Sequence, residues 1–358
     1  MSEETLQTDA RLGRALVRLE AAGDQGLSST AWAAAAGVAE GDAWRLAHEL
    51  RSLGVPVEGS AEEGWRLLGK ADLALPEVLE PLITGTIFAG GVHHFARIGS
   101  TNAAAMRAGA EALALAANQD AEQAENRAWD AAFLADRSTN RGAVWLAEEQ
   151  TAGKGRAGHV WKSNPGDGIY CSALLRPKVS PTDAVILSLA AGLAVVEAVQ
   201  EVTGLWGDLR WPNDVLMGGR KFCGILTELN AEFSTVRYVV VGMGLNVNNP
   251  EFPLELEAIA TSLYIEAGKR FSRVELVAAL LRALDREQTA LHNGVESARE
   301  SILRRFEKYS SFCCGCAVAV EEDGGFEGVT RGLDDRGFLR VETSQGMRTV
   351  LSGGVRKK

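Results

Sequence analysis

A glycine-rich basic loop is the first stretch of the sequence that could do chemistry. EEQTAGKGRAGHVW, residues 148–161, places Lys154 and Arg156 among glycines, between two runs typical of β-strands. Glycines let backbone N–H groups approach an anion closely, and the cations supply the countercharge. The loop is not a P-loop, because Gly155 stands where a serine or threonine would follow the lysine. We therefore expect it to bind a phosphate or a mixed anhydride, the alternative being a basic surface turn.

A predicted β-hairpin carries the second group of candidates. RWPNDVLMGGRKFCGILTEL, residues 210–229, contains a turn with Asn213 and Asp214, a Gly-Gly turn, and Lys221 at the start of the second strand. An aspartate in this place can hold Mg²⁺ through its oxygens. A lysine at a strand end is usually solvated, so the alternative for Lys221 is a plain surface role.

The third group lies at a predicted junction between a strand and a helix. In RIGSTNAAA, residues 97–105, the residues Ser100, Thr101 and Asn102 precede an alanine-rich helix. Residues of these types cap helices by accepting hydrogen bonds from the first N–H groups. They could also bind a polar ring, so this motif alone does not distinguish a cap from a binding site.

The elements that must position these residues fall into three parts. A chain of 358 residues exceeds the usual size of one hydrophobic core. Residues 11–69 predict three amphipathic helices and a short hairpin, the pattern of a winged helix-turn-helix. We divide the chain into a winged helix-turn-helix domain (1–70), a linker (71–84), an α/β (α+β) domain with a mixed β-sheet and helices (85–308), and a small C-terminal β-barrel (309–358).

The charge of the N-terminal part bears on DNA binding. Its third predicted helix offers Arg45, His48 and Arg51 as cations, against several acidic residues in the same region. Phosphate contacts need lysines and arginines, so the electrostatic signal for DNA is weak. The alternative is a dimerisation module or a vestigial one.

The composition of the chain argues against several classes of protein. The sequence has no run of about 18 uncharged apolar residues, and its N-terminus, MSEETLQTDARLG, is acidic and polar. These features argue against a membrane span and a cleaved secretory signal. The net charge of −10 argues against a large non-specific nucleic-acid surface. CCGC at 313–316 lacks the second ligand pair of a zinc site, so it is predicted to lie in a β-strand. We expect a cytoplasmic protein.

Taken together, the motifs resemble one family. STN, EEQTAGKGRAGHVW, RWPNDVLMGGRKFCGILTEL and VVVGMGLNVN occur in the order seen in biotin–protein ligases. The flanking modules resemble the long bacterial form, which has a winged helix-turn-helix and an SH3-like barrel and doubles as a biotin-responsive repressor. The resemblance implies that biotin and ATP, with Mg²⁺ as cofactor, give biotinyl-5′-AMP and pyrophosphate, and that a lysine of the biotin carboxyl carrier domain of a carboxylase then takes the biotinyl group.

The resemblance also implies a role for each candidate residue. The catalytic residues would be Lys221, Arg156 and Lys154. The biotin site would comprise Ser100, Thr101, Asn102, Gln150, Lys154, Gly155, Arg156 and Lys221. ATP would contact Arg156, Trp161, Asn213, Asn246 and Arg356, and the metal would bind Asp214. The implied partners besides the carrier domain are operator DNA of biotin-synthesis genes and a second copy of the chain, in a ligand-dependent homodimer.

The chain departs from the family pattern in two places. The family loop is commonly GRGRRGR, whereas this chain reads GKGRAGH, with Lys154 and His159 in place of arginines. Lysine keeps the charge of arginine but lacks its planar, bidentate guanidinium. The sequence therefore does not decide how tightly the loop retains the adenylate. The segment before Gln150 is longer than usual, by a helix predicted around 120–137. Two alternatives stay open, a lipoate–protein ligase and a biotin-sensing transcription factor with weak or no ligase activity.

Overall fold

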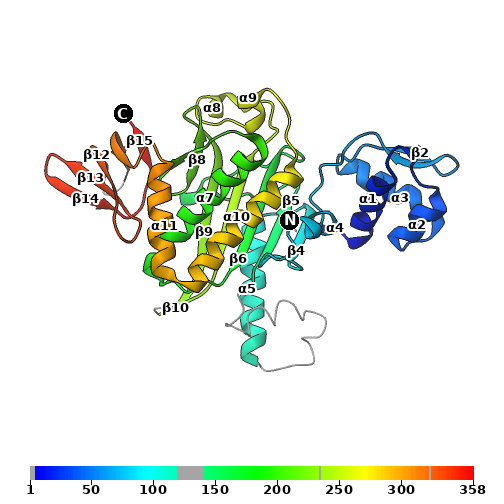
Figure 1. The fold of residues 1–358 in the computed structure, drawn as a ribbon, viewed down its shortest axis with the longest axis horizontal. Helices are drawn as coiled ribbons and strands as arrows, with labels where there is room; N and C mark the ends of the chain where they lie inside the picture. The colour runs from blue at the N-terminus through cyan, green and yellow to red at the C-terminus, as the bar shows by residue number, and fades with distance from the viewer. Residues whose placement is uncertain (1–4, 119–140, 234, 322–323) are drawn as a thin grey trace.

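The computed structural model describes residues 5–118, 141–233, 235–321 and 324–358. Figure 1 shows three parts in a row, with a small helical part at one end, a large β-sheet in the middle and a small β-sheet at the other end. The helix expected around 120–137 lies outside the described residues.

The N-terminal part is built from three helices followed by a two-stranded hairpin. Its elements are α1 (Ala10–Ala22), α2 (Ser29–Ala36), α3 (Ala43–Ser52), β2 (Val57–Ser60) and β3 (Gly64–Leu67). The side chains of Asp9 and Ser28 accept hydrogen bonds at the starts of α1 and α2, which satisfies N–H groups that have no partner within the helix. Trp32 and Trp65 pack in the small core with ring centroids 5.6 Å apart. The helices and the hairpin follow the order expected from the sequence.

Two segments connect the N-terminal part to the central sheet. One is the linker, in which α4 (Pro76–Leu79) packs its Leu79 into the core. The other is β1 (Leu6–Gln7), which pairs antiparallel with the edge strand β4 (Val92–Arg97). Leu6 and Gln7 fall within the module predicted for residues 1–70, but the strand that they form belongs to the central sheet. Its two residues are too short a stretch to show a period-2 pattern.

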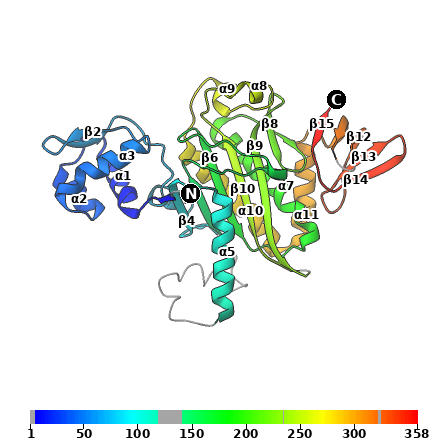
Figure 2. The ribbon, with the colours of Figure 1, turned by 180° about the vertical axis from the view of Figure 1, so that it is seen from behind.

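The central sheet has eight strands in the order β1-β4-β5-β6-β10-β9-β8-β7. Figure 2 labels β4, β6, β10, β9 and β8 across it. The remaining strands are β5 (Ala143–Ala147), β6 (Gly168–Leu175), β7 (Asp208–Arg210), β8 (Asp214–Met217), β9 (Arg220–Glu232) and β10 (Thr235–Asn246). Strands β4 and β5 run parallel and the other neighbours run antiparallel. This is the mixed sheet that the sequence predicts.

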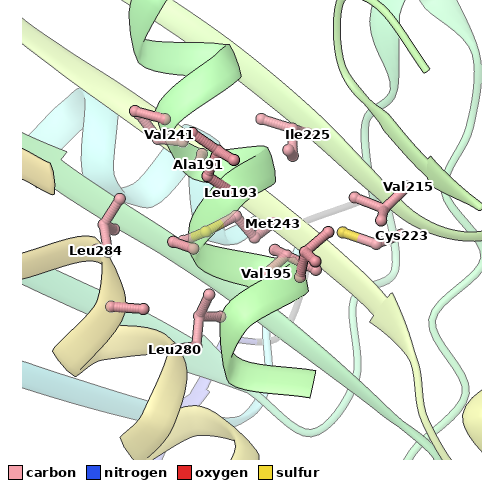
Figure 3. Close-up of a cluster of buried hydrophobic side chains, with 14 of the residues drawn as sticks. Ala191, Leu193, Val195, Val215, Cys223, Ile225, Val241, Met243, Leu280 and Leu284 are labelled. Carbon is pink, nitrogen blue, oxygen red and sulfur yellow. The ribbon is translucent and has the colours of Figure 1, made fainter. Parts of the chain in front are cut away.

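Helices cover both faces of the sheet. On one face lie α7 (Val185–Thr203), α10 (Arg273–Asn293) and α11 (Val295–Lys308), and Figure 3 shows apolar side chains of α7 and α10 in one cluster with those of β8, β9 and β10. The other face carries α5 (Thr101–Asn118), whose alanines pack on Trp145 and Val240. The segment Pro181–Thr203 is long and apolar enough to cross a membrane, but 72% of its most apolar window is buried inside the protein. Its apolar character is therefore explained by its place in the core.

The C-terminal part is a five-stranded antiparallel sheet in the order β14-β13-β12-β11-β15. Its strands are β11 (Cys314–Val320), β12 (Phe326–Leu333), β13 (Leu339–Thr343), β14 (Gly346–Val350) and β15 (Val355–Lys357). Cys314 and Cys316 lie in β11, as expected. Within the described ranges no group of three or more His, Cys, Asp or Glu side chains could hold a metal ion.

Two short helices complete the central part beside the hairpin. These are α8 (Leu254–Glu257) and α9 (Leu263–Ala267), and the chain around them pairs with the start of β9. Lys221 donates its backbone N–H to the carbonyl of Ile259, at 2.8 Å, and accepts from the N–H of Thr261, at 2.9 Å. Because Lys221 also lies opposite Leu216 of β8, its backbone has a neighbour on each edge of β9.

Candidate functional site

A pocket lies on the α5 face of the sheet, at the start of that helix. About 450 Å³ of space free of protein atoms lies among its lining residues, a volume that includes open solvent. Its lining includes most of the residues predicted from the sequence, namely Ser100, Thr101, Asn102, Gln150, Lys154, Gly155, Arg156, Trp161, Asn213 and Lys221. The structure thus brings the three separate motifs together in one cavity.

One wall of the pocket is a continuous polar network. The Gln150 Oε1 atom accepts hydrogen bonds from the N–H and the hydroxyl of Thr101, at 2.9 and 3.1 Å. Ser172 Oγ lies 2.7 Å from Thr101 Oγ1 and 2.6 Å from Asn102 Oδ1. The Asn102 amide donates to Glu228 Oε2 at 2.8 Å. The side chains of the STN motif are thus held in fixed orientations at the start of α5.

The floor of the pocket is made of strand glycines. An added Cβ at Gly242 would lie 2.1 Å from Asn102 Oδ1, and one at Gly244 would lie 2.6 Å from Trp161 Cε2. In β9, a Cβ at Gly224 would lie 2.9 Å from both Lys221 Nζ and Trp161 Cζ3. These positions need glycine because functional side chains lie directly on the backbone of the sheet.

The glycine-rich loop folds against the hairpin. The guanidinium of Arg156 donates to Asn213 Oδ1 at 2.8 Å, and the Asn213 amide donates to the carbonyl of Ile225 at 2.8 Å. Ala157 adopts a left-handed conformation with φ 52°, which is uncommon for a residue other than glycine. The exposed Lys154 lines the same pocket. The loop therefore places two cations at the mouth of the cavity.

The hairpin supplies the third cation. Lys221 Nζ lies 2.5 Å from Asp214 Oδ1 and 5.6 Å from the centroid of the Trp161 ring. Arg210 donates to the other oxygen of Asp214 at 2.6 Å. Burial alone would raise the pKa of the Asp214 carboxyl, but the two cations outweigh burial and hold this pKa below its usual value. Asp214 is therefore ionised at neutral pH and orients Lys221.

The carboxylate of Asp214 does not fit a metal site in this arrangement. One of its oxygens pairs with Lys221 and the other with Arg210. A divalent cation prefers several free oxygen ligands, and it would have to displace one of these cations. The Mg²⁺ role expected for Asp214 from the sequence therefore conflicts with the engagement of both of its oxygens.

Two predicted ATP contacts lie away from the pocket lining. Asn246, at the end of β10, is buried and donates to the carbonyl of Thr261 at 3.1 Å. Arg356, in β15, is exposed and pairs with Glu321 at 3.0 Å. The structure does not bring either side chain into the cavity described above.

Several lining residues were missed by the sequence analysis. Tyr170 and Ser172 belong to the buried strand β6, and the three floor glycines belong to β9 and β10. Gly242 and Gly244 interrupt the apolar run VVVGMGLNVN, and glycines inside a strand often mark close approach of another group. That signal could have identified the floor.

Comparison with known proteins gives a consistent set of matches. Residues 123–246 match the model of the biotin/lipoate A/B protein ligase family, and residues 314–357 match that of the biotin protein ligase C terminal domain. The chain is 31% identical to the bifunctional ligase/repressor BirA of Bacillus subtilis, over 93% of this chain and 94% of that protein. It is 36% identical to the biotin--[acetyl-CoA-carboxylase] ligase of Mycobacterium tuberculosis, over 60% of this chain and 77% of that protein.

A solved structure agrees with these matches. The biotin protein ligase from Aquifex aeolicus, in complex with biotin and ATP, superposes with a TM-score of 0.57 at 27% identity. The match covers 75% of this chain and all of that one.

Proposed function

The chain belongs to the biotin protein ligase family, and from this premise we propose that its pocket joins biotin to ATP and then biotinylates a carrier domain. In the first step a carboxylate oxygen of biotin attacks the α-phosphorus of ATP, and pyrophosphate leaves. In the second step the amine of a lysine on a biotin carboxyl carrier domain attacks the acyl carbon of biotinyl-5′-AMP, and AMP leaves with the bonding electron pair.

The observation that carries this proposal is the meeting of three cations with a neutral polar network in one cavity. The first step brings a carboxylate against a phosphate, so the charges of both must be neutralised. Lys154, Arg156 and Lys221 supply positive charge at the pocket. No side-chain nucleophile is needed, because biotin and the carrier lysine provide the attacking atoms. The pocket therefore works by placement and charge, and by excluding water from the anhydride.

We assign the residues as follows. The Gln150, Thr101, Asn102 and Ser172 network binds the ureido ring, which has both donors and acceptors. Lys221 contacts the biotin carboxylate and later the acyl-phosphate oxygens, while Lys154, Gly155 and Arg156 close over the adenylate. Trp161 and Asn213 bind the nucleoside. Mg²⁺, when present, would neutralise the ATP phosphates. We do not include Asp214 among its ligands, because both oxygens of this carboxylate pair with cations.

Intact-mass spectrometry tests the proposal. The purified protein is incubated with Mg-ATP, an apo carrier domain, and either biotin or lipoate. We expect the carrier to gain one biotinyl group in the presence of ATP and to gain nothing from lipoate. A lipoyl adduct would identify a lipoate–protein ligase instead. A folded protein that binds biotin but forms no adduct would favour a sensor without ligase activity.

A second function, repression of transcription, is supported by the three helices and hairpin of the N-terminal part and by the name of the Bacillus subtilis relative. We propose that this part is a winged helix-turn-helix whose α3 enters a major groove. On α3, Arg45 lies 3.3 Å from Asp42, and Arg51 donates to the carbonyl of Val57. With these cations already engaged, we expect DNA binding with a shallow dependence on salt.

A gel shift with the region upstream of the biotin-synthesis genes tests this second function. The titration is done with and without biotin and ATP, together with sedimentation of the protein alone. We expect a shift that strengthens with both ligands and a matching increase in homodimer. Equal affinity for unrelated DNA of the same length would contradict the repressor proposal. We place the protein in the cytoplasm, where ATP and apo carrier domains are found.

A further inference from the structure

The N-terminal part is attached to the central sheet at both of its ends, and the two attachments meet at one buried cluster. Near the first end, Thr8 follows β1, and its N–H and its hydroxyl both reach the carbonyl of His94, at 3.1 and 3.0 Å. Near the second end, the linker residue Asp72 accepts from the guanidinium of Arg273 at 3.2 Å and from the N–H of Val274 at 3.1 Å. Asp72 thereby also satisfies the start of α10.

Glu148 joins these two attachments inside the protein. Its Oε1 lies 2.9 Å from His94 Nε2, and its Oε2 accepts from Arg273 at 2.6 Å. The Nδ1 atom of the same His94 ring lies 3.1 Å from Thr8 Oγ1. Among these groups His94, Glu148 and Arg273 are 1%, 5% and 6% exposed. The result is a continuous chain of contacts from Thr8 to Asp72 that is half-buried at its two ends and buried in between.

Glu148 also lies two residues before Gln150, the residue that holds the STN motif. The backbone on either side is fixed to β4 and to the segment before α5. Glu148 donates its N–H to the carbonyl of Phe95 at 3.0 Å, and Thr151 donates to the carbonyl of Ile98 at 2.9 Å. Because the carboxylate is buried, removing one of its partners would leave an unpaired charge inside the protein, so its position is closely tied to theirs. A shift of Glu148 therefore passes to the Gln150 side chain and to Thr101.

We propose that Glu148 is a positioning residue for the pocket, and that Thr8 and His94 hold it there, so that loss of the N-terminal contact weakens biotin binding. The cluster lies outside the pocket lining and contacts none of the reacting atoms. This inference rests on the proposed binding of biotin in that pocket. It assigns to residues 6–8 a role in ligand affinity in addition to their role as a tether.

Two matched pairs of full-length variants test the proposal. Thr8→Val removes the hydroxyl while keeping the shape of the side chain, and Thr8→Ser keeps the hydroxyl. Glu148→Gln removes the buried charge, and Glu149→Gln removes a neighbouring charge that pairs with the partly exposed Arg97. Biotin Kd is measured by calorimetry, and amide hydrogen exchange is followed at residues 6–8 and 98–102. Thermal unfolding confirms that each variant is folded.

We expect Thr8→Val and Glu148→Gln to raise the biotin Kd by about 5-fold or more, the lower end of coupling between sites, and to speed exchange at residues 98–102. Thr8→Ser and Glu149→Gln should stay within about 2-fold of the unaltered protein, well below that range. An unchanged Kd in Glu148→Gln overturns the positioning role. An unchanged Kd in Thr8→Val, with faster exchange at residues 6–8 or without it, overturns the link to the N-terminal segment. If the unaltered protein binds no biotin, the proposed function fails, while the exchange data still decide whether Glu148 controls residues 98–102.

Discussion

The ammonium group of Lys221, in β9, lies 2.5 Å from the carboxylate of Asp214, at the start of β8 in the same hairpin. The two residues are not opposite each other in the ladder, since Asp214 lies opposite Gly224 and Lys221 lies opposite Leu216, so the contact is made by their side chains. The carboxylate holds the lysine over the glycine floor, beside Trp161. Lys221 therefore has an acid partner before any ligand arrives, and a carboxylate substrate would share it or compete for it.

Replacing the lysine should cost most of the affinity for biotin. Lys221→Ala removes a charge-assisted contact, so we expect binding weaker by about 1.5–3 kcal/mol, roughly 10- to 150-fold. Lys162→Ala is the control, because Lys162 is exposed and pairs with the exposed Glu255. Calorimetric titration measures the affinity for biotin, and a pyrophosphate-release assay measures the rate of adenylation. Equal affinity in the two variants would contradict the assignment.

Asp214→Asn separates an orienting role from metal binding. If Asp214 only orients Lys221, the variant should lose adenylation rate, while the Mg²⁺ concentration for half-maximal rate stays the same. The physical reason is that both carboxylate oxygens already contact cations. Adenylation is measured at a series of Mg²⁺ concentrations with fixed ATP. A large increase in the Mg²⁺ required would restore Asp214 as a metal ligand.

Adding a methyl group to the floor should displace Trp161. In Gly244→Ala the new Cβ would lie 2.6 Å from the indole, so the ring must move or the strand must shift. Overpacking of this kind typically costs about 1–3 kcal/mol. Because Trp161 is assigned to the nucleoside, we expect a higher KM for ATP. We also expect a change in the intensity of tryptophan fluorescence. Gly69→Ala is the matched control, since nothing lies within 4 Å of its added Cβ, and it should behave as the unaltered protein.

The Glu148 cluster predicts a dependence of stability on pH. Burial would raise the pKa of Glu148, but His94 and Arg273 outweigh it and hold this pKa below its usual value. The contribution to stability is therefore fully present above the unfolded pKa, about 4.3, and is lost as the pH falls through the lower folded value. Urea unfolding should show a difference between the unaltered protein and Glu148→Gln that is largest at neutral pH and shrinks in acid. A difference in stability that grows in acid would contradict a lowered pKa of Glu148 in the folded protein.

Local patterns accounted for the motifs and for the order of the main elements. The STN residues were placed at a helix start because their side chains suit that position, and α5 begins at Thr101. The hairpin was placed from its Gly-Gly turn, and Gly218 and Gly219 both adopt positive φ, which glycine permits at no steric cost. These features depend on neighbouring residues alone.

The contacts that the sequence did not reveal join distant residues. His94, Glu148 and Arg273 come from three separate elements, and nothing near His94 in the sequence indicates a partner 54 residues away. The pairing of Asp214 with Arg210 was equally hidden, although the residues are close, because it depends on how β7 and β8 turn at Pro212. Both pairings are determined by the packing of separate elements and not by the neighbouring sequence.

The double attachment of the N-terminal part limits how that part can move. A module on a single linker can turn about any axis, whereas this one leaves the sheet at β1 and returns through the linker beside Arg273. Two fixed points define one line, so the module keeps a single hinge axis unless one attachment breaks. In the DNA-binding homodimer proposed above, the distance between the two α3 helices would then depend on one angle per copy, and the spacing of DNA half-sites would depend on the same angle.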